Sequence, residues 1–335
     1  MIRIEISRNT ENQRLDRFLR KYFPKASLSH IYMMIRKDLK LNGKRAHEDT
    51  LLHAGDEVVI YMSDEEAASL MRKPRSVKAK RQFGIAYEDD NVLIVNKPFG
   101  LLTHGDSQEK KNHLTNQVIA YLIEKGQYDP QAERSFAPSP ANRIDRNTTG
   151  LVIFAKDAET LRCLNAVLRN KEGIEKYYLT VCEGRMPKGE TRLTGYMKKD
   201  EAKNRVTVSS SPDDGKLMET AVTPIAYSLP GQGNRSLLLV QIFTGRTHQI
   251  RAQLADAGHP LLGDSKYGAR QTGIKSTQLL HSWKLRFTDM GEGKLSYLTG
   301  KTVTAEPPQD MMKIIGNLFG IKSAGELEDT VSDYF

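Results

Sequence analysis

Residues 142–155 form the part of the chain best suited to chemistry. They read Asn-Arg-Ile-Asp-Arg-Asn-Thr-Thr-Gly-Leu-Val-Ile-Phe-Ala, so Asp145 lies between Arg143 and Arg146, and a Thr-Thr-Gly turn leads into an apolar strand. Nearby positive charge favours the ionised form of a carboxylate, and an ionised carboxylate can serve as a nucleophile or a general base. The pattern predicts Asp145 as a catalytic residue, with an ordinary surface turn as the alternative.

Three further segments accompany this stretch. Residues 96–98 read Asn-Lys-Pro, residues 176–179 read Lys-Tyr-Tyr-Leu, and residues 244–251 read Thr-Gly-Arg-Thr-His-Gln-Ile-Arg. In this order and spacing the segments resemble the RluA-type family of RNA pseudouridine synthases, whose motifs look like His-Arg-Leu-Asp-x-x-Thr-Ser-Gly-Leu and Thr-Gly-Arg-Thr-His-Gln-Ile-Arg. The resemblance covers residues 83–315.

The resemblance implies the isomerisation of uridine to pseudouridine in RNA, a reaction that needs no cofactor and no metal. Asp145 matches the family's catalytic aspartate, and its role as nucleophile or as proton acceptor stays open. Arg246 matches the basic partner, which we expect to pair with Asp145, and Tyr178 matches the aromatic residue that stacks on the target base. The other residues of this domain that we expect to bind substrate are Asn142, Arg143, Arg146, Thr149, Lys176 and His248.

One position departs from the family pattern, because Asn142 stands where most members have His. Asn keeps hydrogen-bonding capacity but cannot change its charge near neutral pH. We expect this difference to affect the choice of target more than the activity.

The charge of the chain points to a polyanionic partner. The net charge is +9, and residues 12–47 alone hold ten Lys or Arg against two Asp, a net charge of +8. Nucleic acid fits this charge better than a membrane, because no basic amphipathic helix with a bulky apolar face accompanies it. The basic residues that we expect to contact RNA here are Arg36, Lys37, Lys44 and Arg45.

Other features of the composition narrow the class of protein. The chain starts without an apolar run of signal-peptide length and has no stretch of 18 apolar residues, so we expect a cytoplasmic protein without membrane contact. Its two cysteines, Cys163 and Cys182, form neither a Cys-x-x-Cys pair nor a zinc-type cluster, and no cofactor motif is complete. We expect a monomer that needs no obligate protein partner.

The pattern along the chain predicts an α+β protein. Apolar residues at helical spacing predict two short helices around Leu15–Tyr22 and Ile31–Ile35, and Asn42-Gly43 and residues 57–61 carry hairpin and strand signals. This order resembles the S-four-like αββ RNA-binding module. The expected division is an S-four-like domain at 1–62, a basic linker at 63–82, a catalytic domain at 83–320 and a C-terminal tail at 321–335.

In the catalytic domain the expected strands and helices are mixed in order. We expect strands at 91–95, 151–155, 177–182 and 237–242, and helices at 114–125, 157–170 and 247–257. Such mixing argues against a doubly wound parallel sheet, and the family has a mixed, largely antiparallel sheet with flanking helices. Because side chains alternate along a strand, Tyr177 should point away from the face that carries Tyr178.

Several alternatives remain at this level. Two-part enzymes of the resembled family mostly modify large-subunit ribosomal RNA, with transfer RNA as the second candidate. A catalytically silent RNA-binding or ribosome-assembly factor is the non-enzymatic alternative. An aspartyl-phosphate hydrolase is suggested by the spacing of Asp145, Asn147 and Thr149, but Asn147 could not act as the general acid or base of such a site.

Overall fold

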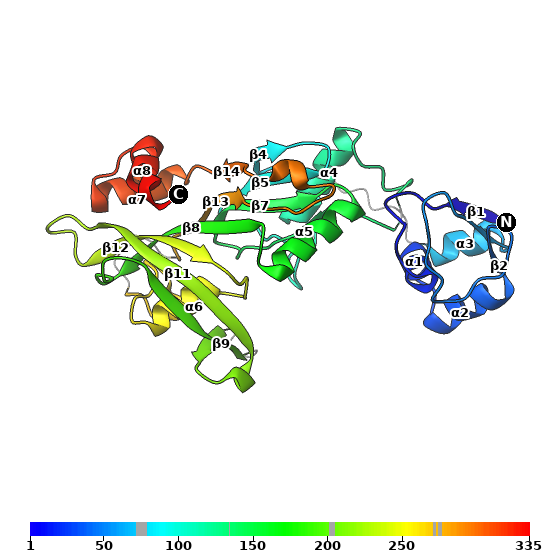
Figure 1. Ribbon diagram of the computed structural model, residues 1–335, viewed down its shortest axis with the longest axis horizontal. Helices are drawn as coiled ribbons and strands as arrows, with labels where there is room; N and C mark the ends of the chain where they lie inside the picture. Colours follow the sequence, from blue (N-terminus) through cyan, green and yellow to red (C-terminus); the bar gives the residue numbers. More distant parts are fainter. Residues whose placement is uncertain (72–78, 134, 201–204, 271–272, 274–276) are drawn as a thin grey trace. The chain divides into compact units, whose positions relative to one another are not determined.

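The computed structural model describes residues 1–71, 79–133, 135–200, 205–270, 273 and 277–335 (Figure 1). The chain divides into two compact units. The first unit comprises residues 1–81, 115–139 and 155–162, and the second comprises 82–114, 140–154 and 163–335. Among the described residues, no helix combines the length and the apolar character needed to cross a membrane.

The N-terminal part of the first unit is a three-stranded antiparallel sheet with three helices. Its elements are β1 (Ile2–Glu5), α1 (Leu15–Tyr22), α2 (Leu28–Lys37), β2 (Leu39–Leu41), β3 (Glu57–Ile60) and α3 (Asp64–Leu70), and the strand order is β1-β3-β2. The two helices predicted from apolar spacing are confirmed. Their predicted core positions, Leu15, Phe18, Ile31 and Ile35, are all buried.

Local signals explain where these elements begin and turn. The Ser27 hydroxyl accepts a hydrogen bond from the amide of His30 and thereby caps α2. Asn42 and Gly43 both have positive φ, and the backbones of Leu41 and Lys44 on either side of them exchange two hydrogen bonds, as the Asn-Gly signal predicts.

The segment expected to be a linker is partly helical. Ser63 caps α3 by accepting a hydrogen bond from the amide of Glu66, and Ala67 is buried in the N-terminal core. The small apolar face of α3 supplied too few residues for the periodicity to reveal it. The basic residues at 72–78 lie outside the described residues.

The second unit is built on a long mixed sheet. The strand order is β10-β9-β11-β12-β8-β13-β7-β5-β4, with β14 added to β13. The pairings from β10 through β13 are antiparallel, and β13 pairs in parallel with β7. The strand bounds are β4 (Gly84–Glu88), β5 (Val92–Lys97), β6 (Ser139–Pro140), β7 (Thr149–Ala155), β8 (Ile174–Glu183), β9 (Thr191–Asp200), β10 (Arg205–Ser209), β11 (Lys216–Tyr227), β12 (Arg235–Ile242), β13 (Leu280–Phe287) and β14 (Thr302–Thr304).

The main helices beyond the N-terminal module follow the expected pattern in part. They are α4 (Leu114–Glu124), α5 (Ala158–Asn170), α6 (Gln249–Asp256), α7 (Gln309–Phe319) and α8 (Ala324–Val331). The first three occupy the positions predicted from sequence. The α+β class is therefore confirmed, although several elements had not been anticipated: the strands β4, β6, β9, β10, β11, β13 and β14 and the helices α7 and α8.

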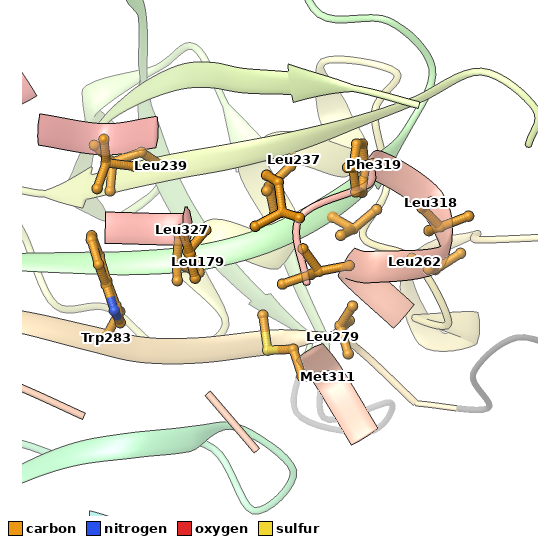
Figure 2. Close-up of a cluster of buried hydrophobic side chains, with 14 of the residues drawn as sticks. Leu179, Leu237, Leu239, Leu262, Leu279, Trp283, Met311, Leu318, Phe319 and Leu327 are labelled. Carbon is orange, nitrogen blue, oxygen red and sulfur yellow. The ribbon is translucent and has the colours of Figure 1, made fainter. Parts of the chain in front are cut away.

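One face of the central strands is covered by the two C-terminal helices (Figures 1 and 2). Tyr177, Leu179 and Leu237 pack in one apolar cluster with residues of α7 and α8, including Leu327 of α8. Helix α8 lies where a tail had been expected, and its Leu327 is fully buried. Because side chains alternate along β8, Tyr178 faces the other side of the sheet, as predicted. That other side carries the candidate active site.

Candidate active site

A buried lysine fixes the loop that carries Asp145. Lys97, the last residue of β5, is fully buried, and its Nζ donates hydrogen bonds to the carbonyl oxygens of Pro98, Leu101 and Arg146 at 3.0, 2.7 and 2.9 Å. Burial lowers the pKa of Lys97 to about 7, and the charge of Asp145 opposes this shift. The three bonds tie residues 98–101 to the segment that follows Asp145.

The loop ends in a close backbone contact. Gly150 has a φ of +105°, and a Cβ placed there would lie 2.0 Å from the carbonyl oxygen of Ser282 on the parallel strand β13. No side chain fits in that space, and the φ value also favours glycine. The Thr-Thr-Gly turn therefore allows β7 to approach β13 directly after the loop.

Asp145 forms an ion pair with Arg251. The Arg251 Nη1 lies 2.9 Å from Asp145 Oδ2, while its Nε and Nη2 donate to the two oxygens of Asp264 at 2.6 and 2.9 Å. The Arg251 and Asp264 side chains are 7% and 1% exposed. Burial lowers the pKa of Arg251, but the hydrogen bonds and charges of Asp264 and Asp145 outweigh it and leave the pKa raised. The two bonds to Asp264 thus fix the guanidinium group of Arg251, and its Nη1 donates to Asp145.

The expected pairing of Arg246 with Asp145 is wrong. The Arg246 Nε donates to the carbonyl oxygen of Leu217 at 3.1 Å, and its amide donates to Gln249 Oε1. Helix α6 begins at Gln249, so Arg246 precedes the helix while Arg251 lies in its first turn. The motif contains both arginines, and only the start of the helix decides which one reaches Asp145. Arg246 still lines the same pocket.

His248 is the third group close to Asp145. Its Nε2 lies 3.8 Å from Asp145 Oδ2, and its Nδ1 lies 3.0 Å from the hydroxyl of Tyr267. That hydroxyl accepts a hydrogen bond from the amide of Val206, which favours donation of its own hydrogen to Nδ1. Burial lowers the pKa of His248 and so favours the neutral ring. In that form Nε2 carries the proton and faces the carboxylate.

Tyr178 and Asp145 line one small pocket of about 90 Å³. Tyr178 is 6% exposed, and burial raises its pKa to about 12, so the phenol stays protonated at neutral pH. The pocket also has an apolar lining, formed by Ile144, Ile242, Ile250 and Leu280. A carboxylate beside an aromatic ring and apolar walls suits a flat base that has left its stack.

Asp145 also lines a neighbouring basic cavity of about 300 Å³, which we call the mouth of the pocket. Arg143, Arg146 and Lys266 line this mouth together with His104, whose pKa is lowered by burial and by the charge of Arg143. The predicted substrate contacts Arg143 and Arg146 thus lie at the entrance. Cations in this position favour a negatively charged strand.

Two predicted substrate contacts have structural partners instead. The Asn142 Oδ1 accepts a hydrogen bond from the amide of Ile153 at 2.8 Å, which fixes the segment before Asp145 to β7. The Thr149 Oγ1 lies 2.7 Å from Nδ1 of His281, whose Nε2 donates to the carbonyl oxygen of Ala305. The sequence alone does not show whether the short polar side chains of Asn142 and Thr149 face a ligand or the backbone.

The remaining predicted contacts lie elsewhere. Lys176 lines a separate groove on the same face of β8 as Tyr178. Four of them are exposed in the first unit: Arg36, Lys37, Lys44 and Arg45.

Comparisons with known proteins find relatives that match most of the chain. A family model described as RNA pseudouridylate synthase matches residues 91–256, a span that contains Asp145, Tyr178 and Arg251. An uncharacterized RNA pseudouridine synthase of Mycoplasma capricolum is 30% identical and covers 92% of this chain and 98% of its own length. Ribosomal large subunit pseudouridine synthase C of Salmonella typhimurium is 30% identical and covers 92% of each chain. The Escherichia coli K12 protein of the same name is 29% identical over the same shares.

Solved structures support the fold. Human RNA pseudouridylate synthase domain containing 4 is 18% identical, covers 70% of this chain and 92% of its own, and has a TM-score of 0.52. Human RNA pseudouridylate synthase domain containing 1 is 19% identical, covers 73% and 96%, and has a TM-score of 0.50.

Proposed function

The chain belongs to the RNA pseudouridine synthase family, and we propose that it isomerises specific uridines of large-subunit ribosomal RNA. The arrangement of Asp145, Arg251 and Tyr178 around one pocket is the observation that carries the proposal. Relatives named for the large ribosomal subunit are similar to this chain over 92% of its length.

In this proposal each group has a part in the reaction. The C1′–N1 bond of uridine breaks, the base turns within the pocket, and C1′ bonds to C5. C5 then loses its proton and N1 gains one, so the composition does not change. Asp145 acts as an anion, either on C1′ or on a ribose proton, and both roles need the orientation that Arg251 gives it. Tyr178 stacks on the detached base and holds it in the position that the C1′–C5 bond requires.

The N-terminal basic residues complete the proposal. In our proposal residues 1–62 form an S-four-like RNA-binding domain whose Arg36, Lys37, Lys44 and Arg45 contact phosphates, and residues 83–320 form the catalytic domain. Sequence-independent phosphate contacts of this kind supply affinity and position the substrate. A monomer acting in the cytoplasm, where ribosomal RNA is found, is the form that we propose.

The test is to map pseudouridines in RNA from cells with and without this protein. We expect discrete sites to disappear from large-subunit ribosomal RNA and to return with the wild-type chain but not with Asp145→Asn. Sites lost from transfer RNA instead would replace the proposed target. An unchanged map would favour the catalytically silent RNA-binding factor.

A further inference from the structure

A second groove lies beside the catalytic pocket. It has a volume of about 530 Å³ and is lined by residues 166–168 and 170–176, by 241–243 at the end of β12 and by 288–291. This volume is within the range of about 300–1,000 Å³ that is common for ligand sites. Ile242 lines both the groove and the catalytic pocket, so the two are neighbours. We call it the Lys176 groove.

Lys176 is the feature of this groove that the catalytic site does not explain. It lies two residues before Tyr178 on β8 and therefore on the same face of the strand. It is 8% exposed, and its Nζ has neither a hydrogen bond nor an ion pair with any residue that the structure describes. Burial lowers the pKa of Lys176. A buried ammonium without a counter-charge is costly to a folded protein.

The acidic residues that line the groove have other partners or lie at its edge. Glu175 accepts a hydrogen bond from the Tyr177 hydroxyl at 3.0 Å and lies 3.8 Å from Arg286. Asp289 accepts a hydrogen bond from the amide of Gly291. Glu172 is exposed.

The other lysine of the groove is already neutralised. Lys171 is 2.7 Å from the carboxylate of Glu219. The positive charge of Lys176 is thus available to an anion that enters the groove from outside.

We propose that the Lys176 groove binds a backbone phosphate of the RNA strand next to the target uridine. This inference rests on the proposed function and names one contact that the substrate makes. Lys176 and Tyr178 are two residues apart, about 7 Å along a strand, a span that one nucleotide of an extended chain can bridge. A base held at Tyr178 would place its neighbouring phosphate within reach of Lys176.

The first test measures single-turnover pseudouridine formation by the full-length protein over a range of RNA concentrations. Lys176→Met keeps an unbranched side chain, one atom shorter, and removes its charge, and Lys313→Met, at an exposed position of α7, is the matched control. For Lys176→Met we expect about tenfold weaker apparent affinity, the usual effect of losing one charge-assisted hydrogen bond, with a rate at saturating RNA within about twofold of wild type. Lys176→Arg should recover most of the affinity, and Lys313→Met should match wild type.

The second test locates the phosphate. RNAs with a single uncharged methylphosphonate at each linkage around the target uridine are compared with wild type and with Lys176→Met. One linkage should weaken wild-type binding about tenfold and leave the variant unchanged. Inorganic phosphate, added at constant ionic strength, should not raise the melting temperature of wild type more than that of the variant. If it does, the groove takes free phosphate, and the RNA assignment is overturned.

The remaining outcomes separate the two proposals. A lower melting temperature of Lys176→Met would give Lys176 a structural role and overturn the inference, because replacing an unpaired buried charge by Met should not destabilise the fold. An unchanged affinity, or a lower saturating rate at unchanged affinity, would also overturn it. Failure of the wild-type protein to modify large-subunit RNA would instead count against the proposed function.

Discussion

At the scale of single residues, the proposed catalytic role of Asp145 gives the most direct test. Asp145→Asn keeps the shape of the side chain but removes the anion that either mechanism requires, so we expect pseudouridine formation to fall by more than about 1,000-fold. RNA binding and the melting temperature should stay close to wild type, and Asp213→Asn at an exposed position is the control. Near-normal formation of pseudouridine by Asp145→Asn would contradict the assignment.

The two arginines of residues 244–251 should differ sharply. Arg251 bonds to Asp145 and to the buried Asp264, whereas Arg246 bonds to a backbone carbonyl. Arg251→Lys should reduce the single-turnover rate about 100-fold or more and also lower stability, because a point charge cannot replace the fork that holds two carboxylates. Arg246→Lys should lose less than about tenfold. The reverse ranking in single-turnover assays would refute the ion pair as the functional one.

The buried His281 makes stability depend on pH. Its pKa is lowered from 6.5 to about 4 by burial, although the hydrogen bond to Ala305 acts in the opposite direction. Below pH 6.5 the unfolded chain binds a proton that the folded chain resists, so stability present above pH 6.5 is lost as the pH falls toward 4. The loss attributable to this residue is up to about 3 kcal/mol.

Urea unfolding at pH 7.5 and pH 4.5 checks this expectation. His281→Gln should be less stable than wild type at pH 7.5 but should lose less of its stability at pH 4.5. Equal losses in the two proteins would show that His281 does not titrate as its surroundings imply.

At the scale of elements, α8 should contribute to the stability of the second unit. Leu327 is fully buried against the central strands (Figure 2). Leu327→Ala should therefore lower the free energy of unfolding by about 2–5 kcal/mol. The control is Asp329→Ala, at an exposed position of α8, which should cost less than about 1 kcal/mol. Similar small losses in both variants would mean that α8 is dispensable to the fold.

Elements also mark the limit of what the sequence could predict. Strong apolar runs and helical periods located β5, β7, β8, β12, α5 and α6, and strand alternation placed Tyr177 and Tyr178 on opposite faces. Strand β9 was missed because much of it is polar and only partly buried. The partner of Asp145 was missed because the family resemblance gave that role to Arg246, and only the folded helix brings Arg251 of the same segment to Asp145. The contact of Asn142 depends on how its segment lies against β7, and that of Thr149 depends on β7 meeting β13; local patterns encode neither.

At the scale of the whole molecule, the basic N-terminal module should determine how binding depends on salt. Arg36 and Lys37 lie in the exposed last turn of α2. Changing both to Gln should reduce the slope of log affinity against log salt by about 1.5, because each lost phosphate contact contributes about 0.7 to 0.9. Changing Lys313 and Lys322, both exposed, to Gln is the control. Equal slopes in RNA titrations would mean that the module's charge does not contact substrate.

The position of α7 and α8 in the chain has a consequence for how the protein is made. A ribosome synthesises every strand of the sheet before it reaches these helices, yet the helices cover one apolar face of β8, β12 and β13. Until they emerge, a nascent chain displays Leu179 and Leu237 to its surroundings, and exposed apolar surface of this kind promotes aggregation. A message cut short before residue 309 would therefore yield a product that is cleared or precipitated, even though it would contain every residue of the catalytic pocket.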